Sequence, residues 1–276
     1  MKKLILISAL LIFACSSDDS SDTNDNNNPP SNCDVVYLDS NGVTIKACDD
    51  ALVGESGVVN GIAYTIVDGA TLGSMISNGD DVTRICTTRI VDMASLFENN
   101  NSFNQPIGNW DVSNVTNMNR MFEYSSFNQP IGNWDVSNVT NMHFMFGYNL
   151  VFNQPIGDWD VSSVTNMQGM FQGQFSYNGN TFNWQNPNPF NQDISNWDVS
   201  NVTNMDSMFG SSEFNQDISN WDVSNVTNMA GMYMGAISFN QNLSNWNVDN
   251  VIQCITFSKI TPQWTLPQPN FTNCNP

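Results

Sequence analysis

WDVSNVTNM, residues 110–118, is a nine-residue stretch that recurs unchanged further along the 276-residue chain. The later identical copies begin at Trp134, Trp197 and Trp221. A copy with one difference, WDVSSVTNM, begins at Trp159, and a more divergent sixth copy, WNVDNVIQC, begins at Trp246. An enzyme needs one set of convergent groups, whereas six copies at spacings of 24, 25, 38, 24 and 25 residues indicate a repeat architecture.

Each repeat has the same apolar positions, which in the first complete copy are Phe103, Ile107, Trp110, Val112, Val115, Met118, Met121 and Phe122. The alternation of Trp110 and Val112 with polar neighbours predicts a short, half-buried strand. From Val115 the apolar spacing becomes three, which predicts a short helical or 3₁₀ turn. The segment FNQPIG or FNQDIS then leads the chain back to the next copy of the motif. A lone repeat cannot bury its Trp and Met, so we expect the repeats to stack.

The fold predicted from this pattern is an α/β repeat, a leucine-rich-repeat-like solenoid of about seven coils over residues 85–258. The spacing I-x-x-W-x-V-x-x-V-T-x-M-x-x-M-F resembles the BspA-like leucine-rich repeats of bacterial surface proteins. The sequence WDVSNVTNM is even more similar to the "bacterial surface protein 26-residue repeat" of mycoplasma-type lipoproteins. This resemblance implies surface exposure and binding of protein or host molecules, with no catalytic residues to carry over.

Two different segments flank the repeats, a β-rich N-terminal cap over residues 33–84 and a C-terminal cap over residues 259–276. VVYLDSNGVTIKAC and GVVNGIAYTIV each place alternating apolar residues around Asn-Gly, which predicts two hairpins. ATLGSMISNG predicts a short helix that ends at its glycine. The proline-rich C-terminal segment is expected to lie extended over the last coil, with Trp264 and Phe271 as covers.

Residues 1–14 have the charged start and short apolar run of a signal peptide. The run is too short for a membrane-spanning helix, which needs about 20 apolar residues. It fits an ordinary secretory signal, but the residues that end at Cys15 resemble a bacterial lipobox, which makes Cys15 the lipidated residue. Residues 15–32 are expected to be a disordered tether. Their acidic Ser-Asp run resembles the export signal of Bacteroidetes-type surface lipoproteins. We therefore expect a lipoprotein on the outer membrane or cell surface, attached to the membrane through Cys15 alone.

The charge balance is strongly acidic, with a formal net charge of -19 and only seven Lys plus Arg. Nucleic acids and anionic lipid headgroups are bound through basic patches, so both are poor partners for this chain. The partners expected outside the cell are protein or glycan ligands.

Six cysteines include Cys15, and the remaining five cannot all pair within one chain. Disulfides form readily outside the cytoplasm. We expect Cys254 to pair with Cys274, because this bond would close the C-terminal end of the repeats. Among the three N-terminal cysteines, we expect Cys48 to pair with Cys86. No CxxC motif is present, so a zinc site is not expected.

The aspartates of the repeated motif are expected to form a column on the surface, because stacked repeats lie about 4.8 Å apart. They are Asp111, Asp135, Asp160, Asp198 and Asp222. One interpretation is that each caps the next turn by accepting backbone hydrogen bonds. The alternative is a calcium or glycan site, since calcium takes oxygen ligands and would neutralise the row. Calcium is thus a possible but not a required cofactor.

One repeat is longer than the others, with an insertion near residues 173–189 that carries Phe175, Tyr177, Phe182 and Trp184 among Asn, Gly and Pro. Aromatic residues in solenoid insertions often anchor ligands, although they can also fold back as a flap. The sequence predicts a non-catalytic surface lipoprotein that acts as a binding or adhesion module for protein or host-cell ligands. The alternative is a calcium- or carbohydrate-binding accessory protein of the outer membrane.

Overall fold

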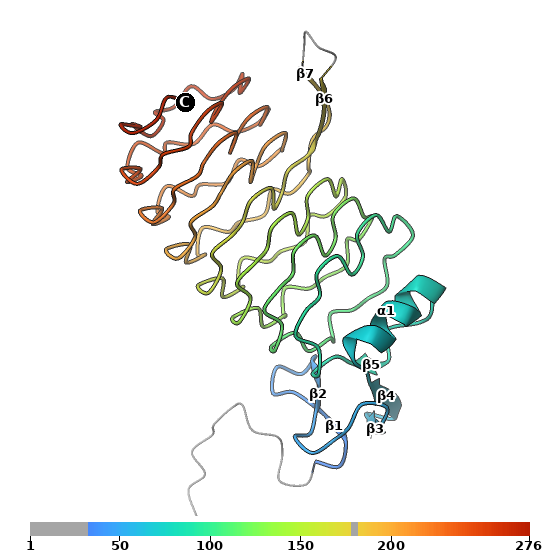
Figure 1. Ribbon diagram of the computed structural model, residues 1–276. Helices are drawn as coiled ribbons and strands as arrows, with labels where there is room; N and C mark the ends of the chain where they lie inside the picture. Colours follow the sequence, from blue (N-terminus) through green and yellow to red (C-terminus); the bar gives the residue numbers. More distant parts are fainter. Residues whose placement is uncertain (1–32, 178–181) are drawn as a thin grey trace, which may run out of the picture.

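The computed structural model describes residues 33–177 and 182–276, apart from the side chains of residues 176–185. Most of the chain is irregular, with a small β region at the N-terminal end and regularly spaced aromatic residues along the rest. Figure 1 shows the repeats lying one after another along a single axis, with the β region at one end and the C-terminus at the other. No helix within the described ranges is both long and apolar enough to cross a bilayer.

The N-terminal β region is built from two hairpins and one added strand. The strands are β1 (Val36–Leu38), β2 (Ile45–Ala47), β3 (Ser56–Val59), β4 (Ile62–Ile66) and β5 (Ile85–Cys86). β1 pairs antiparallel with β2, β3 pairs antiparallel with β4, and β5 lies parallel to β4. At the β3–β4 turn, Asn60 and Gly61 both have positive φ, as a tight Asn-Gly hairpin requires. Both predicted hairpins are confirmed.

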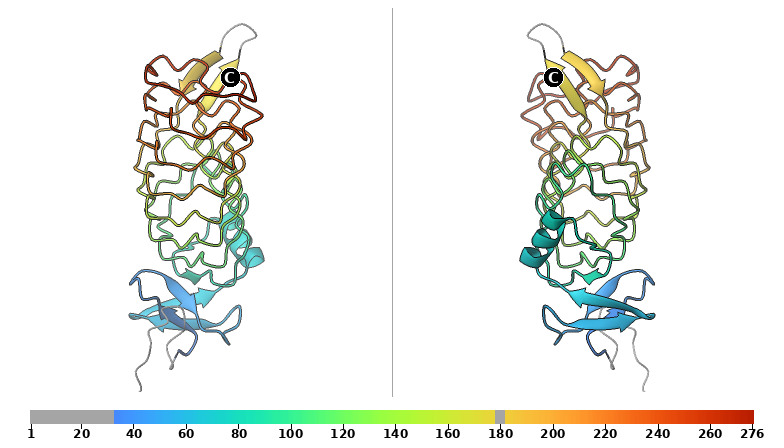
Figure 2. Two further views of the ribbon diagram at one scale, coloured as in Figure 1. Left: turned by 90° about the vertical axis from the view of Figure 1, so that its left-hand side faces the viewer. Right: turned by 90° about the vertical axis from the view of Figure 1, so that its right-hand side faces the viewer.

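The expected short helix is also present, as α1 (Gly69–Asn78), which lies beside the first repeats (Figure 2). Asp68 caps its first turn by accepting from the Thr71 amide, and Gly79 ends it with φ 76°. Leu72 is fully buried in the hydrophobic core that continues through the repeats. α1 therefore covers the N-terminal end of that core.

The core of the repeats contains two parallel columns of aromatic rings. One column comprises Phe97, Phe122, Phe146, Phe171, Phe209 and Tyr233, with 5.3–5.9 Å between successive centroids. The other comprises Phe103, Phe127, Phe152, Phe190, Phe214 and Phe239, with 6.0–6.4 Å between centroids. Within a repeat the two rings are only 3.9–4.1 Å apart. The repeat thus buries its rings against its neighbours, as expected.

The backbone of each repeat differs from the predicted strand and helical turn. Trp110 and Val115 each donate a hydrogen bond three residues back, so the WDV stretch consists of turns. The bridges between repeats fall later, at Asp92, Asn117, Asn141, Asn166, Asn204, Asn228 and Gln253. Downstream of Asn117, every second residue donates its N–H to the next repeat, and Arg120 and Tyr124 have positive φ. Hydrogen bonds to the next repeat at every second residue therefore replace the predicted helical turn. The spacing of the apolar residues does not reveal this pattern.

Polar side chains of the motif form hydrogen bonds from repeat to repeat. The indole N–H of each motif Trp donates to a backbone carbonyl of the preceding repeat, for example Trp134 to Ile107. The same bond joins the remaining pairs Trp110–Val82, Trp159–Ile131, Trp197–Ile156, Trp221–Ile194 and Trp246–Ile218. The asparagine of each FNQ segment has a similar role: the Asn128 side chain accepts a hydrogen bond from the backbone amide of Asn153 in the next repeat. These bonds explain why Trp and Asn recur unchanged.

Disulfides lie at both ends of the described chain. Cys254 pairs with Cys274, as expected, and Trp264 and Phe271 pack on the last rings of the core. The expected Cys48–Cys86 bond is wrong, because Cys48 pairs with Cys33 and Cys86 is a buried free thiol. The β1–β2 hairpin brings Cys33 and Cys48 together at its open end, where the Cys48 amide donates to Val35.

We predict that Tyr233→Phe raises the free energy of unfolding by about 1 kcal/mol, since the buried Tyr233 hydroxyl has no hydrogen-bond partner. Tyr233 is the one member of its ring column that is not phenylalanine. Urea unfolding measures the change. The reciprocal variant Phe209→Tyr places a hydroxyl at the equivalent position and should destabilise the protein; a gain in stability from both variants would contradict the explanation.

Candidate functional site

The aspartate column is a set of turn caps. In each member one carboxylate oxygen accepts from the backbone amide of the serine two residues later: Asp111–Ser113, Asp135–Ser137, Asp160–Ser162, Asp198–Ser200 and Asp222–Ser224. The hydrogen bonds from the Ser200 side chain and backbone lower the pKa of Asp198, and they outweigh the repulsion from Asp222. The capping interpretation is the one that the geometry supports.

Asp111 differs from the other members because the N-terminal region covers it. Its side chain is buried, and the second carboxylate oxygen accepts from the Thr88 hydroxyl at 2.6 Å. Among the residues that the structure describes, no three His, Cys, Asp or Glu side chains gather closely enough to hold a metal ion. The column thus lacks the convergent ligands that the calcium alternative requires.

We predict that calcium and chelator leave the thermal midpoint of the fragment 33–276 unchanged. A cation bound only by the folded state would raise the midpoint in proportion to its occupancy. Differential scanning calorimetry with millimolar calcium, and then with excess chelator, measures this. A calcium-dependent rise that disappears in Asp160→Asn, an exposed member of the column, would contradict the prediction.

The insertion forms a hairpin of two strands, β6 (Gln174–Tyr177) and β7 (Phe182–Asn186). It stands out from the stacked repeats (Figure 1). Of the four predicted aromatic ligand residues, Phe175 is half-buried at the base of the hairpin. The side chains of Tyr177, Phe182 and Trp184 lie outside the described residues. The hairpin returns to the repeats through Asn188, which is fully buried.

A groove beside the base of this hairpin contains two tyrosines that the sequence reasoning missed. Tyr124 and Tyr148 stack with 4.4 Å between ring centroids and 15° between ring planes. The groove has a volume of about 250 Å³ and is lined by Asn99, Asn101, Tyr124, Ser125, Ser126, Tyr148, Leu150, Val151 and Gln174. We call it the tyrosine groove. It crosses four successive repeats, since its lining residues follow the ring-column residues Phe97, Phe122, Phe146 and Phe171.

The sequence does carry a signal for this pair. Tyr124 and Tyr148 both stand two residues after a Met-Phe pair in adjacent repeats, a slot that varies elsewhere in the chain. Equivalent side chains in neighbouring repeats face each other, so two aromatic residues in this slot predict a stack.

Neighbouring side chains hold the tyrosines in place. Phe144 stacks on Tyr148 at 5.5 Å, and the Arg120 guanidinium lies over the Phe144 ring at 5.8 Å. Arg120 also pairs with the carboxylates of Glu98 and Glu123, at 3.5 and 3.1 Å. The positive charge of Arg120 is thereby paired with two carboxylates, and none of the three residues lines the groove.

The tyrosines themselves are uncharged near neutral pH. Burial raises the pKa of Tyr148 to about 12, and it also raises the pKa of Tyr124. The groove consequently presents neutral aromatic, amide and hydroxyl groups.

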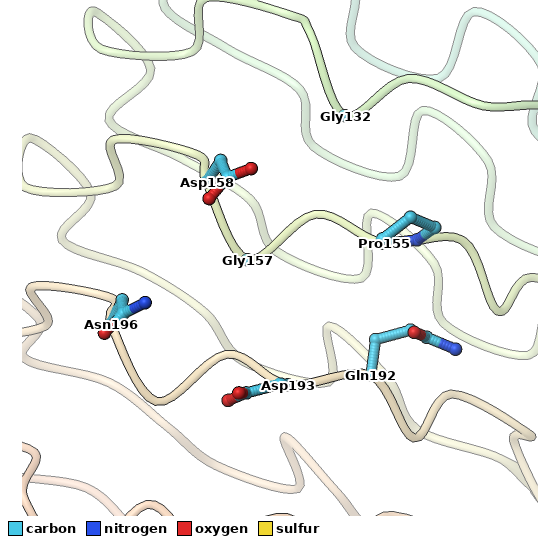
Figure 3. A pocket seen from close by; sticks show the side chains of 7 residues that line it. All are labelled: Gly132, Pro155, Gly157, Asp158, Gln192, Asp193 and Asn196. Carbon is cyan, nitrogen blue, oxygen red and sulfur yellow. The ribbon is translucent and has the colours of Figure 1, made fainter.

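A second groove lies where repeats of the QPIG type meet those of the QDIS type (Figure 3). Gly132, Pro155, Gly157, Asp158, Gln192, Asp193 and Asn196 line it. Asp158 stands where neighbouring repeats have asparagines such as Asn133, whose amide donates to the preceding repeat. Asp193 is engaged with the Ser195 amide, and this hydrogen bond lowers the pKa of Asp193. The groove has no aromatic or apolar side chain other than Pro155, so it offers less for a ligand to bury than the tyrosine groove.

A family model described as Mycoplasma protein of unknown function, DUF285, matches residues 70–184 and again residues 185–262. The two matches together cover more than half of the 276 residues. They confirm the mycoplasma-type part of the expected resemblance. No curated protein and no solved structure matches the chain.

Proposed function

The chain belongs to this family of Mycoplasma proteins of unknown function, and we propose that it is a non-catalytic, lipid-anchored surface protein that binds a ligand in the tyrosine groove. Cys15 is the proposed anchor, and residues 15–32 are the tether that holds the body away from the outer membrane. The ligand is a protein or glycan outside the cell. The acidic net charge of -19 argues against nucleic acid and anionic lipid.

We further propose that the repeats form a leucine-rich-repeat-like solenoid of the BspA type. The in-register bridges, the stacked ring columns and the Trp–carbonyl bonds from repeat to repeat support this architecture. Such an array offers a long surface on which neighbouring repeats contribute side chains to one ligand.

The observation that carries the binding function is the stacked pair Tyr124–Tyr148 beside the inserted hairpin. Tyr124 is 38% exposed, whereas the rings of the two core columns are buried. Exposed aromatic side chains with polar neighbours are frequent anchors of binding sites. Most other polar side chains of the motif are engaged within the stack, as caps or in bonds between repeats, and no pair of unlike acid and base groups converges in the tyrosine groove.

The test compares the fragment 33–276 with the double variant Tyr124→Ala/Tyr148→Ala on immobilised panels of oligosaccharides and purified extracellular proteins. We expect at least one ligand whose affinity falls about 30-fold in the variant, as loss of a hot spot of about 2 kcal/mol implies. Asp160→Asn, on another surface, is the control and should bind normally. Thermal unfolding checks that the double variant is folded. Equal binding of every ligand by the folded variant would refute the proposed site.

Anchoring is tested separately in cells. The full chain should be accessible to added protease on intact cells and should partition into detergent. Cys15→Ala should release the protein from the membrane; a variant that stays in the detergent phase would contradict the proposed anchor.

A further inference from the structure

We propose that the tyrosine groove binds a neutral, linear oligosaccharide that lies along the axis of the repeats. This inference rests on the proposed binding function and names the class of ligand. Its first support is the direction of the groove, which runs from Asn99 through Tyr124 and Tyr148 to Gln174. Each of these residues comes from the next repeat along the axis, so the groove suits an extended chain of similar units better than one compact molecule.

The second support is a set of polar side chains that make no hydrogen bond. Within the described residues, the amides of Asn99 and Asn101 and the hydroxyl of Ser126 have no side-chain partner. The asparagines of the FNQ segments are engaged instead, as Asn128 is with both Asn153 and Gln154. Amide and hydroxyl groups both donate and accept, which is what the paired hydroxyls of a sugar require. Asn99, Asn101 and Ser126 all line the tyrosine groove, so their free donors and acceptors are available to one ligand.

The third support is the stacked tyrosine pair. A sugar ring has a face of C–H groups that packs on an aromatic ring, while its hydroxyls point to the sides. Tyr124 provides a partly exposed ring, with Asn101 and Ser126 in the same groove lining. Leu150 and Val151 add apolar contact on the side of Tyr148. This combination of one aromatic platform and flanking neutral donors fits a sugar unit.

The charge around the groove favours a neutral glycan over an acidic one. No Asp, Glu, Lys, Arg or His is among the groove residues. Arg120, whose charge acts on Tyr148, is paired with the carboxylates of Glu98 and Glu123, and the chain as a whole is strongly acidic. A sulfated or uronic acid polymer would gain no ion pair and would be repelled by the net charge.

A protein ligand is disfavoured because the groove is shallow and uncharged. Protein interfaces concentrate their affinity in aromatic or arginine anchors that enter fully desolvated pockets. A groove of about 250 Å³ without a charged residue offers no such pocket. Binding of a protein in the groove, without binding of a neutral oligosaccharide, would therefore contradict the proposal.

The experiment is isothermal titration of the fragment 33–276 with cellohexaose, xylohexaose and mannohexaose, and with a hexamer of galacturonic acid as the acidic probe. We expect binding of at least one neutral hexamer, weaker binding of its disaccharide, and no binding of the acidic hexamer. Tyr124→Ala should weaken binding about tenfold or more, whereas Tyr124→Phe, which keeps the ring, should retain most of it. Asn101→Ala should cost about fivefold, the equivalent of one hydrogen bond. Asp160→Asn is the control.

The outcomes separate this inference from the proposed function. If no neutral hexamer binds, while a purified extracellular protein binds and is lost in Tyr124→Ala, the glycan inference is wrong and the binding function stands. If neither class of ligand responds to Tyr124→Ala in a folded variant, both are wrong. Neutral glycan binding that is unaffected by Tyr124→Ala and Asn101→Ala also overturns the inference, since the sugar then binds elsewhere.

Discussion

Phe171→Ala is expected to lower the free energy of unfolding by about 4 kcal/mol, the largest effect of any single substitution considered for the core. Phe171 is fully buried and packs against the rings of four residues, which are Phe146, Phe190, Trp197 and Phe209. Its centroid lies 4.0 Å from that of Phe190, 5.8 Å from Phe146 and 5.9 Å from Phe209. Alanine would leave a cavity in the middle of both ring columns, and the fixed spacing of the repeats prevents the neighbouring rings from closing it.

The position of Phe171 makes the form of the unfolding curve informative as well. In a stack of repeats each unit contacts only its neighbours, so a weak central unit divides the array into two parts. We expect Phe171→Ala to broaden urea unfolding or split it into two transitions, as followed by tryptophan fluorescence. Phe144→Ala is the matched control, because Phe144 is only half-buried and lies on the surface. A single sharp transition with an equal loss in both variants would mean that the repeats do not unfold as coupled neighbours.

The composition of the core could be predicted from the sequence, whereas the backbone of the repeat could not. A residue that recurs every 24 or 25 positions meets its own equivalent when repeats stack, so Trp134, Met145 and Phe146 were expected inside and are buried. The predicted strand at WDV relied on alternating apolar residues. The same alternation of apolar residues also arises when turns place every second side chain inward. Only the hydrogen bonds distinguish such turns from a strand, and the sequence does not show them. The positive φ of Arg120, a residue with no special turn propensity, is imposed by hydrogen bonds to the next repeat.

The candidate site was predictable only in part, for a related reason. The Asp column is a candidate site because it repeats. A structural role also produces repetition, and these carboxylates serve as turn caps. Tyr124 and Tyr148 occupy a position that varies between repeats, so the consensus of the repeat does not single them out. A residue that differs between repeats is nevertheless free to serve binding, because the stacking of the repeats does not fix it. The Cys48–Cys86 expectation ignored the β1–β2 hairpin, whose two ends carry Cys33 and Cys48.

Asn188 illustrates how the chain accommodates an insertion without breaking the stack. Its side-chain amide donates to the backbone carbonyls of Phe146 and Asn149, and its carbonyl oxygen accepts from the Phe190 amide. The backbone of Asn188 also bonds to Ser211. Asn188 is fully buried, and the Asn149 carbonyl and the Phe190 amide depend on its side chain for a partner, whereas the Phe146 carbonyl also accepts from the Asn149 amide. The side chain thus fixes the point at which β7 rejoins the repeats and Phe190 enters its ring column.

Asn188→Ala is therefore expected to destabilise the protein by about 3 kcal/mol, because the Asn149 carbonyl and the Phe190 amide lose their hydrogen-bond partner inside the core. Asn186→Ala is the matched control on the same hairpin: the Asn186 amide makes one exposed bond to Gln174, and its loss should cost about 0.5 kcal/mol or less. Urea unfolding gives both values, and hydrogen exchange should show faster opening of the Phe190 amide, which donates to the Asn188 side chain, in Asn188→Ala. If the two variants proved equally stable, the anchor for the inserted hairpin would have to lie elsewhere. The hairpin, which supplies Gln174 to the tyrosine groove, would then be held by the pairing of β6 with β7 and by the Ser211 hydroxyl, which donates to the Gln174 carbonyl.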